Sequence, residues 1–286
     1  MAVLFALIAL FGWGAGDIFV TIVSRKIGNI ASYFWLVILG LIFVSLYIPF
    51  AGNIKDFGMF GAAIILNIIH TLGNVSYFRG LEKGNASIIG TLGGAFPLIS
   101  VILSLFLFRE KMNLILAFGI IFTLLGVILV SFYQEGGVKI SRKILNNHGI
   151  RYGLFTMIAW GIYFGLIRIP SRIIGFFWAG YPMYLIGPFL LLLPAFRKVN
   201  LKKVLVDKTI IIFLFIEVIL LTLADFSYNL GVISGFTSLV APIAGAFPVL
   251  FVILSRFVFR ERLTVQQKAG IGLALAGIVL IGISSI

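Results

Sequence analysis

The chain contains no cysteine, so disulfides, thiolate metal sites and thiol catalysis are excluded. It has only two histidines, and nine acidic residues stand against 22 basic ones in 286 residues. The motifs H-E-x-x-H, G-x-S-x-G and G-x-x-x-x-G-K-S/T, which mark metalloproteases, serine hydrolases and phosphate-binding loops, are absent. We therefore expect a protein that is not an enzyme, binds no cofactor and no metal, and hydrolyses no ATP by itself.

Charged residues are also scarce, at 11%, whereas 61% of the residues are apolar. Soluble domains average about 25% charged and about 45–50% apolar residues, so this chain is too apolar for a soluble globule. Its repeated apolar runs reach the length that crosses a bilayer, about 18–20 residues, and indicate a multi-pass protein embedded in the lipid bilayer of the cell (inner) membrane. The basic excess is then an orientation signal, and we expect no nucleic-acid partner because no soluble basic face exists.

Ten apolar segments can be placed along the chain. They are long and uninterrupted and lack the alternation of membrane-barrel strands, so helices are the expected spanning structure. We predict an all-α membrane protein with ten transmembrane helices, the first of them retained because no basic leading region precedes it. The segments are Ala2–Val23, Ser32–Ala51, Phe57–Phe78, Ala86–Phe108, Leu114–Tyr133, Ile150–Arg168, Phe176–Phe196, Thr209–Leu230, Thr237–Phe259 and Gln266–Ile286.

The sequence contains two copies of one pattern. Gly94-Ala95-Phe96-Pro97 returns 151 residues later as Gly245-Ala246-Phe247-Pro248, and Phe108-Arg109-Glu110 returns at the same offset as Phe259-Arg260-Glu261. Near the start of each copy the offset is 147, which relates Trp13-Gly14 to Trp160-Gly161. We predict a first five-helix repeat at 1–133, a basic linker loop at 134–149 and a second five-helix repeat at 150–286.

Five helices per copy is an odd number, so the second copy enters the membrane from the opposite side to the first. Such inverted repeats are typical of secondary transporters, which expose a central site to either side in turn. The alternative is a duplicated bundle with no transport path. Of the 22 basic residues, 17 lie in the odd-numbered connections. The positive-inside rule therefore places those connections in the cytoplasm and both chain ends outside.

Three acidic residues lie inside the predicted spans: Asp17, Glu217 and Asp225. An ionisable side chain at the bilayer centre costs about 2.5–3.5 kcal/mol on insertion scales, which makes it a functional candidate. Glu217 lies closest to the middle of its segment. It could bind a coupling proton or a cationic ligand, or it could form a structural pair with an arginine such as Arg168.

Polar residues also follow one face of the third segment, where Asn67, His70, Asn74 and Tyr77 are spaced by three, four and three residues. Trp13 and Asp17 on the first segment and Asp225 and Tyr228 on the eighth add further polar faces, which should turn inward, away from lipid. We predict a polar cavity there, lined also by Trp160 and, with less weight, Tyr163 and Tyr181. Taken alone, His70 could equally be a hydrogen-bonded core histidine.

Pro97 and Pro248 fall inside the fourth and ninth segments at equivalent positions. A proline removes one backbone hydrogen bond and bends a helix. The two residues act either as hinges or as static bends around the bundle.

These features together resemble two EamA-type domains of the drug/metabolite transporter superfamily. The resemblance rests on Trp13-Gly14 and Trp160-Gly161, on Tyr77 through Ser87 and Tyr228 through Ser238, and on the two proline helices with their Arg-Glu ends. It implies a ten-helix bundle that moves small polar metabolites, most often amino acids or related compounds outward, without a cofactor. It also implies that both chain ends are cytoplasmic, opposite to the charge count.

We therefore predict a secondary transporter, an exporter of small polar metabolites such as amino acids, that works by alternating access as a monomer or homo-oligomer. Its partners would be a small-molecule substrate, lipid and coupling protons. Two rivals remain open: a membrane subunit that transports nothing, and a flippase for a lipid-linked substrate.

Overall fold

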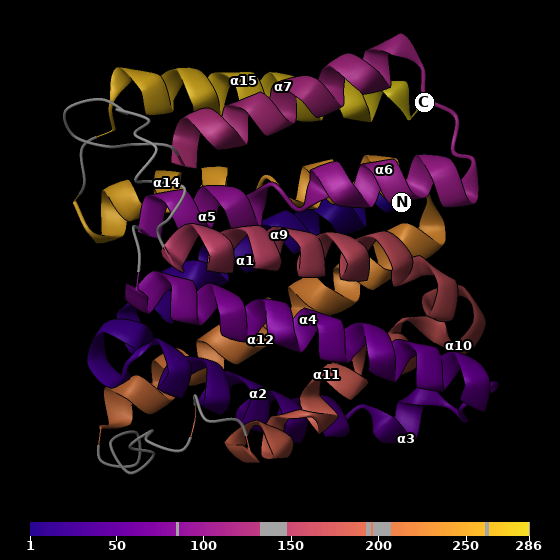
Figure 1. Cartoon of the computed structure of the whole chain (residues 1–286), viewed down its shortest axis with the longest axis vertical. Coiled ribbons are helices and arrows are strands. Elements are labelled where there is room, and N and C mark those ends of the chain that lie inside the picture. Colours follow the sequence, from indigo (N-terminus) through magenta and orange to yellow (C-terminus); the bar gives the residue numbers. More distant parts are fainter. Residues whose placement is uncertain (84–85, 132–147, 193–195, 197–206, 261–262, 286) are drawn as a thin grey trace.

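The computed structural model describes residues 1–83, 86–131, 148–192, 196, 207–260 and 263–285. Every regular element within these ranges is a helix. The long helices run side by side, and both chain ends lie on the right-hand side of the view in Figure 1. The helices of the first half are α1 (Ala2–Ile27), α2 (Asn29–Ser45), α3 (Ile48–Ala51), α4 (Phe57–Lys83), α5 (Ala86–Gly94), α6 (Pro97–Phe108) and α7 (Leu114–Ser131).

The second half repeats this order with different breaks. Its helices are α9 (His148–Leu166), α10 (Arg168–Gly180), α11 (Pro182–Leu185), the short 3₁₀ helix η1 (Gly187–Leu192), α12 (Lys208–Ser234), α13 (Thr237–Ala244), α14 (Phe247–Val258) and α15 (Val265–Ser284).

All ten predicted segments are helical, but several are interrupted. Six helical stretches among the described residues are long and apolar enough to span a membrane, and α9 with α10 makes a seventh if that pair, bent by 81°, counts as one span. The second, fourth, seventh and ninth segments are divided into shorter helices. The structure thus shows an all-helical membrane protein with six or seven candidate spans among the described residues, and the number of ten transmembrane helices stays a prediction. Large apolar side chains such as Phe106 and Val279 point outward, 80% and 60% exposed, as lipid-facing residues do.

The paired prolines begin helices instead of bending them. The helix α5 ends at Gly94 and α6 starts at Pro97, while α13 ends at Ala244 and Pro248 stands in the first turn of α14. The first turn of a helix tolerates proline because its N–H groups have no partner within the helix. The predicted kink inside a continuous helix is thus a break between two helices in each half.

Residues at equivalent positions in the two halves make equivalent contacts. A Cβ atom on Gly14 of α1 would lie 2.9 Å from the carbonyl oxygen of Phe247, and one on Gly161 of α9 would lie 3.2 Å from that of Phe96. Each half thus packs its first helix against the proline helix of the other half, α1 on α14 and α9 on α6.

The helices α7 and α15 cross at glycines. A Cβ atom on Gly277 would lie 2.4 Å from the hydroxyl oxygen of Thr123, and one on Gly126 would lie 2.4 Å from the amide nitrogen of Ala274. Real Cβ atoms do not approach other atoms this closely, so the backbones touch only because side chains are missing there. Small residues permit this type of close packing between helices in lipid.

Gly277→Ala is expected to destabilise the protein by roughly 1–3 kcal/mol, because overpacking forces the two helices apart. The measurement is the midpoint of thermal unfolding in detergent micelles. Gly272→Ala on the same helix is the matched control, because nothing lies within 4 Å of the added methyl group. Equal midpoints for both variants would show that the crossing does not depend on the missing side chain.

The start of α12, the helix that contains Glu217 and Asp225, is fixed by a side-chain cap. The Asp207 carboxylate accepts hydrogen bonds from the backbone N–H groups of Thr209 and Ile210, at 2.9 and 3.4 Å. These bonds, the one from Thr209 first, together with the nearby Lys26 ammonium, hold the pKa of Asp207 below its usual value. The helix therefore begins at a defined residue, which sets which of its faces turns inward.

Candidate functional site

An inner cavity lies between the two halves, bordered by α1, α2, α4, α9, α11, α12 and α14. Together with the open solvent at its mouth it holds about 770 Å³ that no protein atom fills, and the centre of a water-sized sphere can occupy about 100 Å³ of this space. Nine of its 17 lining side chains are aromatic. The cavity is therefore mainly an aromatic chamber with a few polar groups.

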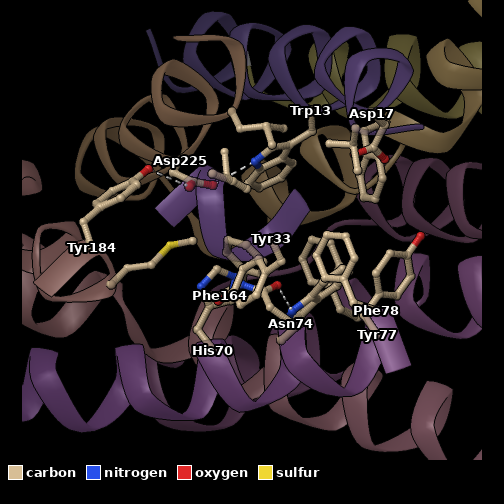
Figure 2. A pocket seen from close by; sticks show the side chains of 17 residues that line it. Trp13, Asp17, Tyr33, His70, Asn74, Tyr77, Phe78, Phe164, Tyr184 and Asp225 are labelled. Atoms are coloured by element: carbon tan, nitrogen blue, oxygen red, sulfur yellow. Dashed lines mark hydrogen bonds between the residues drawn. The ribbon is translucent and has the colours of Figure 1, made fainter. Parts of the chain in front are cut away.

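Asp225 on α12 is one of these polar groups. The Trp13 indole N–H donates to its Oδ1 at 2.8 Å, and the Tyr184 hydroxyl donates to its Oδ2 at 3.4 Å. The carboxylate is partly exposed and faces the chamber (Figure 2). The two donors fix its orientation while leaving acceptor positions for a ligand.

A second set of three residues has the same arrangement. The Trp160 indole N–H donates to Oδ1 of Asn74 at 2.9 Å, and the Asn74 amide donates to the Tyr33 hydroxyl at 3.3 Å. The offsets of the duplication relate the three members of this set, in order, to Trp13, Asp225 and Tyr184. We call the two sets the asparagine triad (Trp160, Asn74, Tyr33) and the aspartate triad (Trp13, Asp225, Tyr184). They differ chemically at one position, where one has an amide and the other a carboxylate.

Two further ionisable side chains line the chamber. Asp17 lies one helical turn after Trp13 on α1, and its carboxylate has no hydrogen-bond partner among the described residues. His70 on α4 stacks on the Tyr163 ring, with ring centroids 4.2 Å apart and planes at 15°. The part of the chamber lining that the structure describes thus contains two acids and one histidine, and no lysine or arginine.

An outer cavity, of which the centre of a water-sized sphere can occupy about 530 Å³, lies next to the chamber toward one end of the bundle. The two cavities share Asp17, Val20, Tyr77 and Phe247 in their linings. The guanidinium of Arg25, which also lines the outer cavity, lies 4.7 Å from the centre of the Phe259 ring. This end of the bundle provides the way into the chamber.

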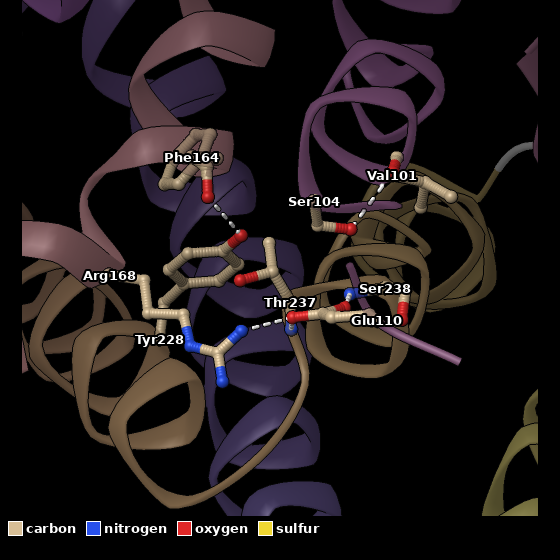
Figure 3. A network of polar contacts seen from close by, with 8 residues as sticks. All are labelled: Val101, Ser104, Glu110, Phe164, Arg168, Tyr228, Thr237 and Ser238. Atoms are coloured by element: carbon tan, nitrogen blue, oxygen red, sulfur yellow. Dashed lines mark hydrogen bonds and ion pairs between the residues drawn. The ribbon is translucent and has the colours of Figure 1, made fainter. Parts of the chain in front are cut away.

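The opposite end is closed by a buried polar network (Figure 3). The Glu110 carboxylate pairs with Arg168 and accepts hydrogen bonds from the backbone N–H groups of Thr237 and Ser238 at the start of α13, both at 2.9 Å. Glu110 is 7% exposed, and the Arg168 guanidinium also lies 5.0 Å from the centre of the Phe108 ring. A carboxylate on two free N–H groups at a helix N-terminus is a strong interaction, because the helix dipole adds to the hydrogen bonds.

The chain reaches this network through a left-handed turn. Arg109 has φ 51, and the equivalent Arg260 has φ 57. A residue with a side chain adopts a left-handed conformation at a cost in free energy. Both arginines adopt it, at equivalent positions just after the two proline helices. At the closed end the turn brings Glu110 back toward α13.

Equivalent elements differ between the two ends of the bundle. At the closed end α6 packs against α13, whereas the equivalent pair α5 and α14 flanks the outer cavity. Val101 of α6 is 6% exposed, but the equivalent Val252 of α14 lines the outer cavity. Both prolines are buried, and Pro248 is among the residues that line the outer cavity.

Seven of the ten predicted binding residues line the chamber: Trp13, Asp17, His70, Asn74, Tyr77, Trp160 and Asp225. The other three do not. Asn67 donates to the carbonyl oxygens of Ala63 and Ala179 and joins α4 to α10. The Tyr228 hydroxyl donates to the Phe164 carbonyl oxygen at 2.8 Å, and its side chain is fully buried.

Glu217 lies outside both cavities. It is completely buried, and neither carboxyl oxygen has a hydrogen-bond partner among the described residues. The alternative that Glu217 pairs with Arg168 was wrong, because Arg168 pairs with Glu110.

Sequence reasoning did not single out Tyr33 and Tyr184, and it weighed Tyr181 instead. Tyr181 is 7% exposed and bonds to Ser45, and Tyr163 lies behind His70, so neither lines the chamber. The signal for Tyr33 and Tyr184 was present, because the offset of 151 relates them. Glu110 was noted only as part of the repeated Phe-Arg-Glu motif. Its counterpart Glu261 lies outside the described residues.

Comparisons with known proteins agree with this architecture. The model of the EamA-like transporter family matches residues 1–132 and 147–283. An uncharacterized protein of Methanocaldococcus jannaschii, MJ1333.1, is 31% identical over 134 residues, which are 46% of this chain and 96% of that protein. A protein of known crystal structure has the same fold, with a TM-score of 0.79 at 15% identity over 99% of this chain and 96% of that one. The chain therefore belongs to the EamA-like transporter family and is a multi-pass membrane transporter of the drug/metabolite transporter superfamily.

Proposed function

We propose that the protein is a secondary transporter that exports a small polar metabolite, such as an amino acid or a related compound, across the cell membrane by alternating access. The observation that supports this most is the chamber, which is open at one end and closed at the other. The pair α6 and α13 at the closed end is equivalent to the pair α14 and α5 at the open end. A site that opens to one side at a time, between two similar halves, is the arrangement that alternating access requires.

The transporter is proposed to consist of two inverted five-helix repeats, 1–133 and 150–286, that together make ten membrane passages. The exchanged packing of α1 on α14 and of α9 on α6 supports this division, because the two contacts join equivalent residues of the two halves. The proposed linker at 134–149 lies almost wholly outside the described residues.

In the proposed opposite state, the two halves exchange their present packing, so that the open end closes and the closed end opens. In it α5 would pack against α14, and α6 would separate from α13 with loss of the Glu110 contacts. The breaks between α5 and α6 and between α13 and α14 are the proposed hinges, because short turn hydrogen bonds, such as those from Ala95 N–H to the Leu92 carbonyl and from Ala246 N–H to the Ile243 carbonyl, replace the regular helical ones there. If the charge count gives the orientation, the present structure is open to the cytoplasm.

Glu217 is proposed to bind the coupling proton. A buried carboxyl without a hydrogen-bond donor favours its uncharged form, since an unpaired buried charge is expensive. Asp17 lies on α1, which packs against the helix of Glu217, and it lines both cavities. The proton is proposed to reach Glu217 from the outer cavity by way of Asp17.

Glu217→Gln is expected to abolish the response of transport to an imposed pH gradient while leaving exchange without a gradient intact. Glutamine has the same shape and carries no exchangeable charge. Uptake into proteoliposomes with and without the gradient measures this. A variant that responds to the gradient as the wild type does would remove Glu217 from the coupling mechanism.

Counterflow tests the proposed function as a whole. Purified protein is reconstituted into liposomes preloaded with amino acids, amines, sugars or phosphorylated metabolites, and accumulation of the labelled compound is followed. We expect accumulation for one class. No accumulation of any class by folded protein would contradict secondary transport.

A further inference from the structure

The charges of the chamber bear on which class of compound it accepts. Among the described residues that line the chamber, Asp17 and Asp225 are acidic and His70 is the one basic side chain, and none is a lysine or an arginine. His70 is 4% exposed and stacked against Tyr163. A positively charged ligand would meet two carboxylates here, whereas a ligand carboxylate would find no guanidinium or ammonium partner.

The neutral polar groups of the chamber do not take the place of a cation. One N–H of the Asn74 amide donates to Tyr33, and the amide oxygen accepts from Trp160. The Trp13 and Tyr184 donors are directed at Asp225. A ligand carboxylate could accept hydrogen bonds from the second N–H of Asn74 or from a tyrosine hydroxyl, but no cation among the described lining residues would balance its charge, so its burial is costly.

Arg25 does not serve the chamber. It lines the outer cavity and not the chamber, and its guanidinium lies 4.7 Å from the centre of the Phe259 ring. An ammonium group at Asp225 is therefore held in the chamber without a described arginine beside it for a carboxylate of the same ligand.

The aromatic walls favour the same kind of ligand. The Trp13 ring is held edge-on by Phe164 and Phe247, with centroids at 5.1 and 5.9 Å, so it is a rigid surface beside Asp225. Aromatic faces attract organic cations once these are removed from water, and they also pack against an apolar body.

We propose that the substrate is an organic monocation: an amine on an aromatic or alkyl body, without a carboxylate. Its ammonium group binds Asp225 in the aspartate triad, and its body lies among the aromatic side chains toward the asparagine triad. The duplicated chamber is polar at both triads and charged at one of them, which gives the ligand one orientation. This proposal rests on the transport function proposed above.

Three probes that share one aromatic body test the proposal: 2-phenylethylamine, L-phenylalanine and 3-phenylpropionate. Their binding to the purified protein in detergent micelles is measured by calorimetry, and their counterflow is measured in proteoliposomes. We expect the amine to bind at least roughly tenfold more tightly than the amino acid, and we expect no detectable binding of the acid. A hydrogen bond to a charged group contributes about 1.5–3 kcal/mol, and burying the unpaired carboxylate of the amino acid should cost at least about as much in binding free energy.

Asp225→Asn is expected to weaken amine binding by roughly 10- to 100-fold, the range for loss of a charge-assisted hydrogen bond. Asp56→Asn is the matched control. Asp56 is exposed, and its carboxylate accepts a hydrogen bond from the Met59 N–H at the start of α4, which an asparagine side chain can accept as well. This variant should bind the amine as the wild type does.

The outcomes separate the two proposals. Counterflow and binding of phenylalanine equal to or stronger than those of the amine would overturn the substrate class and leave the transport function in place. Amine binding without counterflow of any probe would overturn the transport function and leave the ligand class. Absence of both, with the wild type folded, would overturn both.

Discussion

Amine counterflow by Asp225→Asn is expected to fall by roughly 10- to 100-fold and to recover most of that loss when Asn74→Asp is added. The single change removes the negative charge of the aspartate triad, and hydrogen bonds to charged groups contribute about 1.5–3 kcal/mol. The double change restores one carboxylate, now in the other triad. Initial rates of labelled 2-phenylethylamine uptake measure both variants against the wild type.

The recovery follows from the equivalence of the triads. Asn74 has an indole donor and a tyrosine hydroxyl as partners, as Asp225 has, and the two sets occupy equivalent places around one chamber. A carboxylate at position 74 therefore meets the same kinds of neighbours, and the ligand would bind in the reverse direction. A double variant as weak as the single one would contradict the view that charge alone distinguishes the triads.

Glu110→Gln is expected to open the closed end. The change leaves the Arg168 guanidinium buried without its counter-ion, and breaking a buried ion pair costs roughly 3–5 kcal/mol. A shift of that size moves a two-state equilibrium from one state largely to the other. The state in which α6 and α13 separate should then dominate.

The absence of cysteine makes this measurable, since a single introduced thiol is the only reactive one. Val101→Cys lies in the closed end, and its reaction with a polar thiol reagent should be slow in the wild-type background and fast with Glu110→Gln. Asp207→Asn is the control, because it removes the exposed pair with Lys26, and exposed pairs contribute little. Unchanged labelling with Glu110→Gln would remove this network from gating.

Much of this architecture could be predicted from the duplication. The offsets already relate Trp13 to Trp160 and Tyr77 to Tyr228, and the spacing of His70, Asn74 and Tyr77 placed all three on the face that lines the chamber. Periodicity identifies which face of a helix turns inward. It does not identify whether an inward residue meets a cavity or another helix, and for this reason Glu217 and Asn67 were grouped with the lining.

The closed end could not be predicted in the same way. Glu110 lies just after a helix, where an exposed charge is the usual expectation, and it is buried because the left-handed Arg109 turns the chain toward α13. Its partners at α13 are backbone N–H groups, which leave no mark in the sequence. The interrupted helices were missed for a related reason, since apolar content shows that a segment suits the membrane without showing where its helix breaks.

The most direct test of alternating access compares two equivalent positions, Val101→Cys and Val252→Cys, each in an otherwise cysteine-free protein. In membranes without substrate, Val252→Cys should react readily through the outer cavity, and Val101→Cys should react slowly. During counterflow of an amine, labelling should rise at position 101 and fall at position 252. Reciprocal change is the predicted result, because one end opens as the other closes. Labelling that changes in the same direction at both positions, or at neither, would contradict the account.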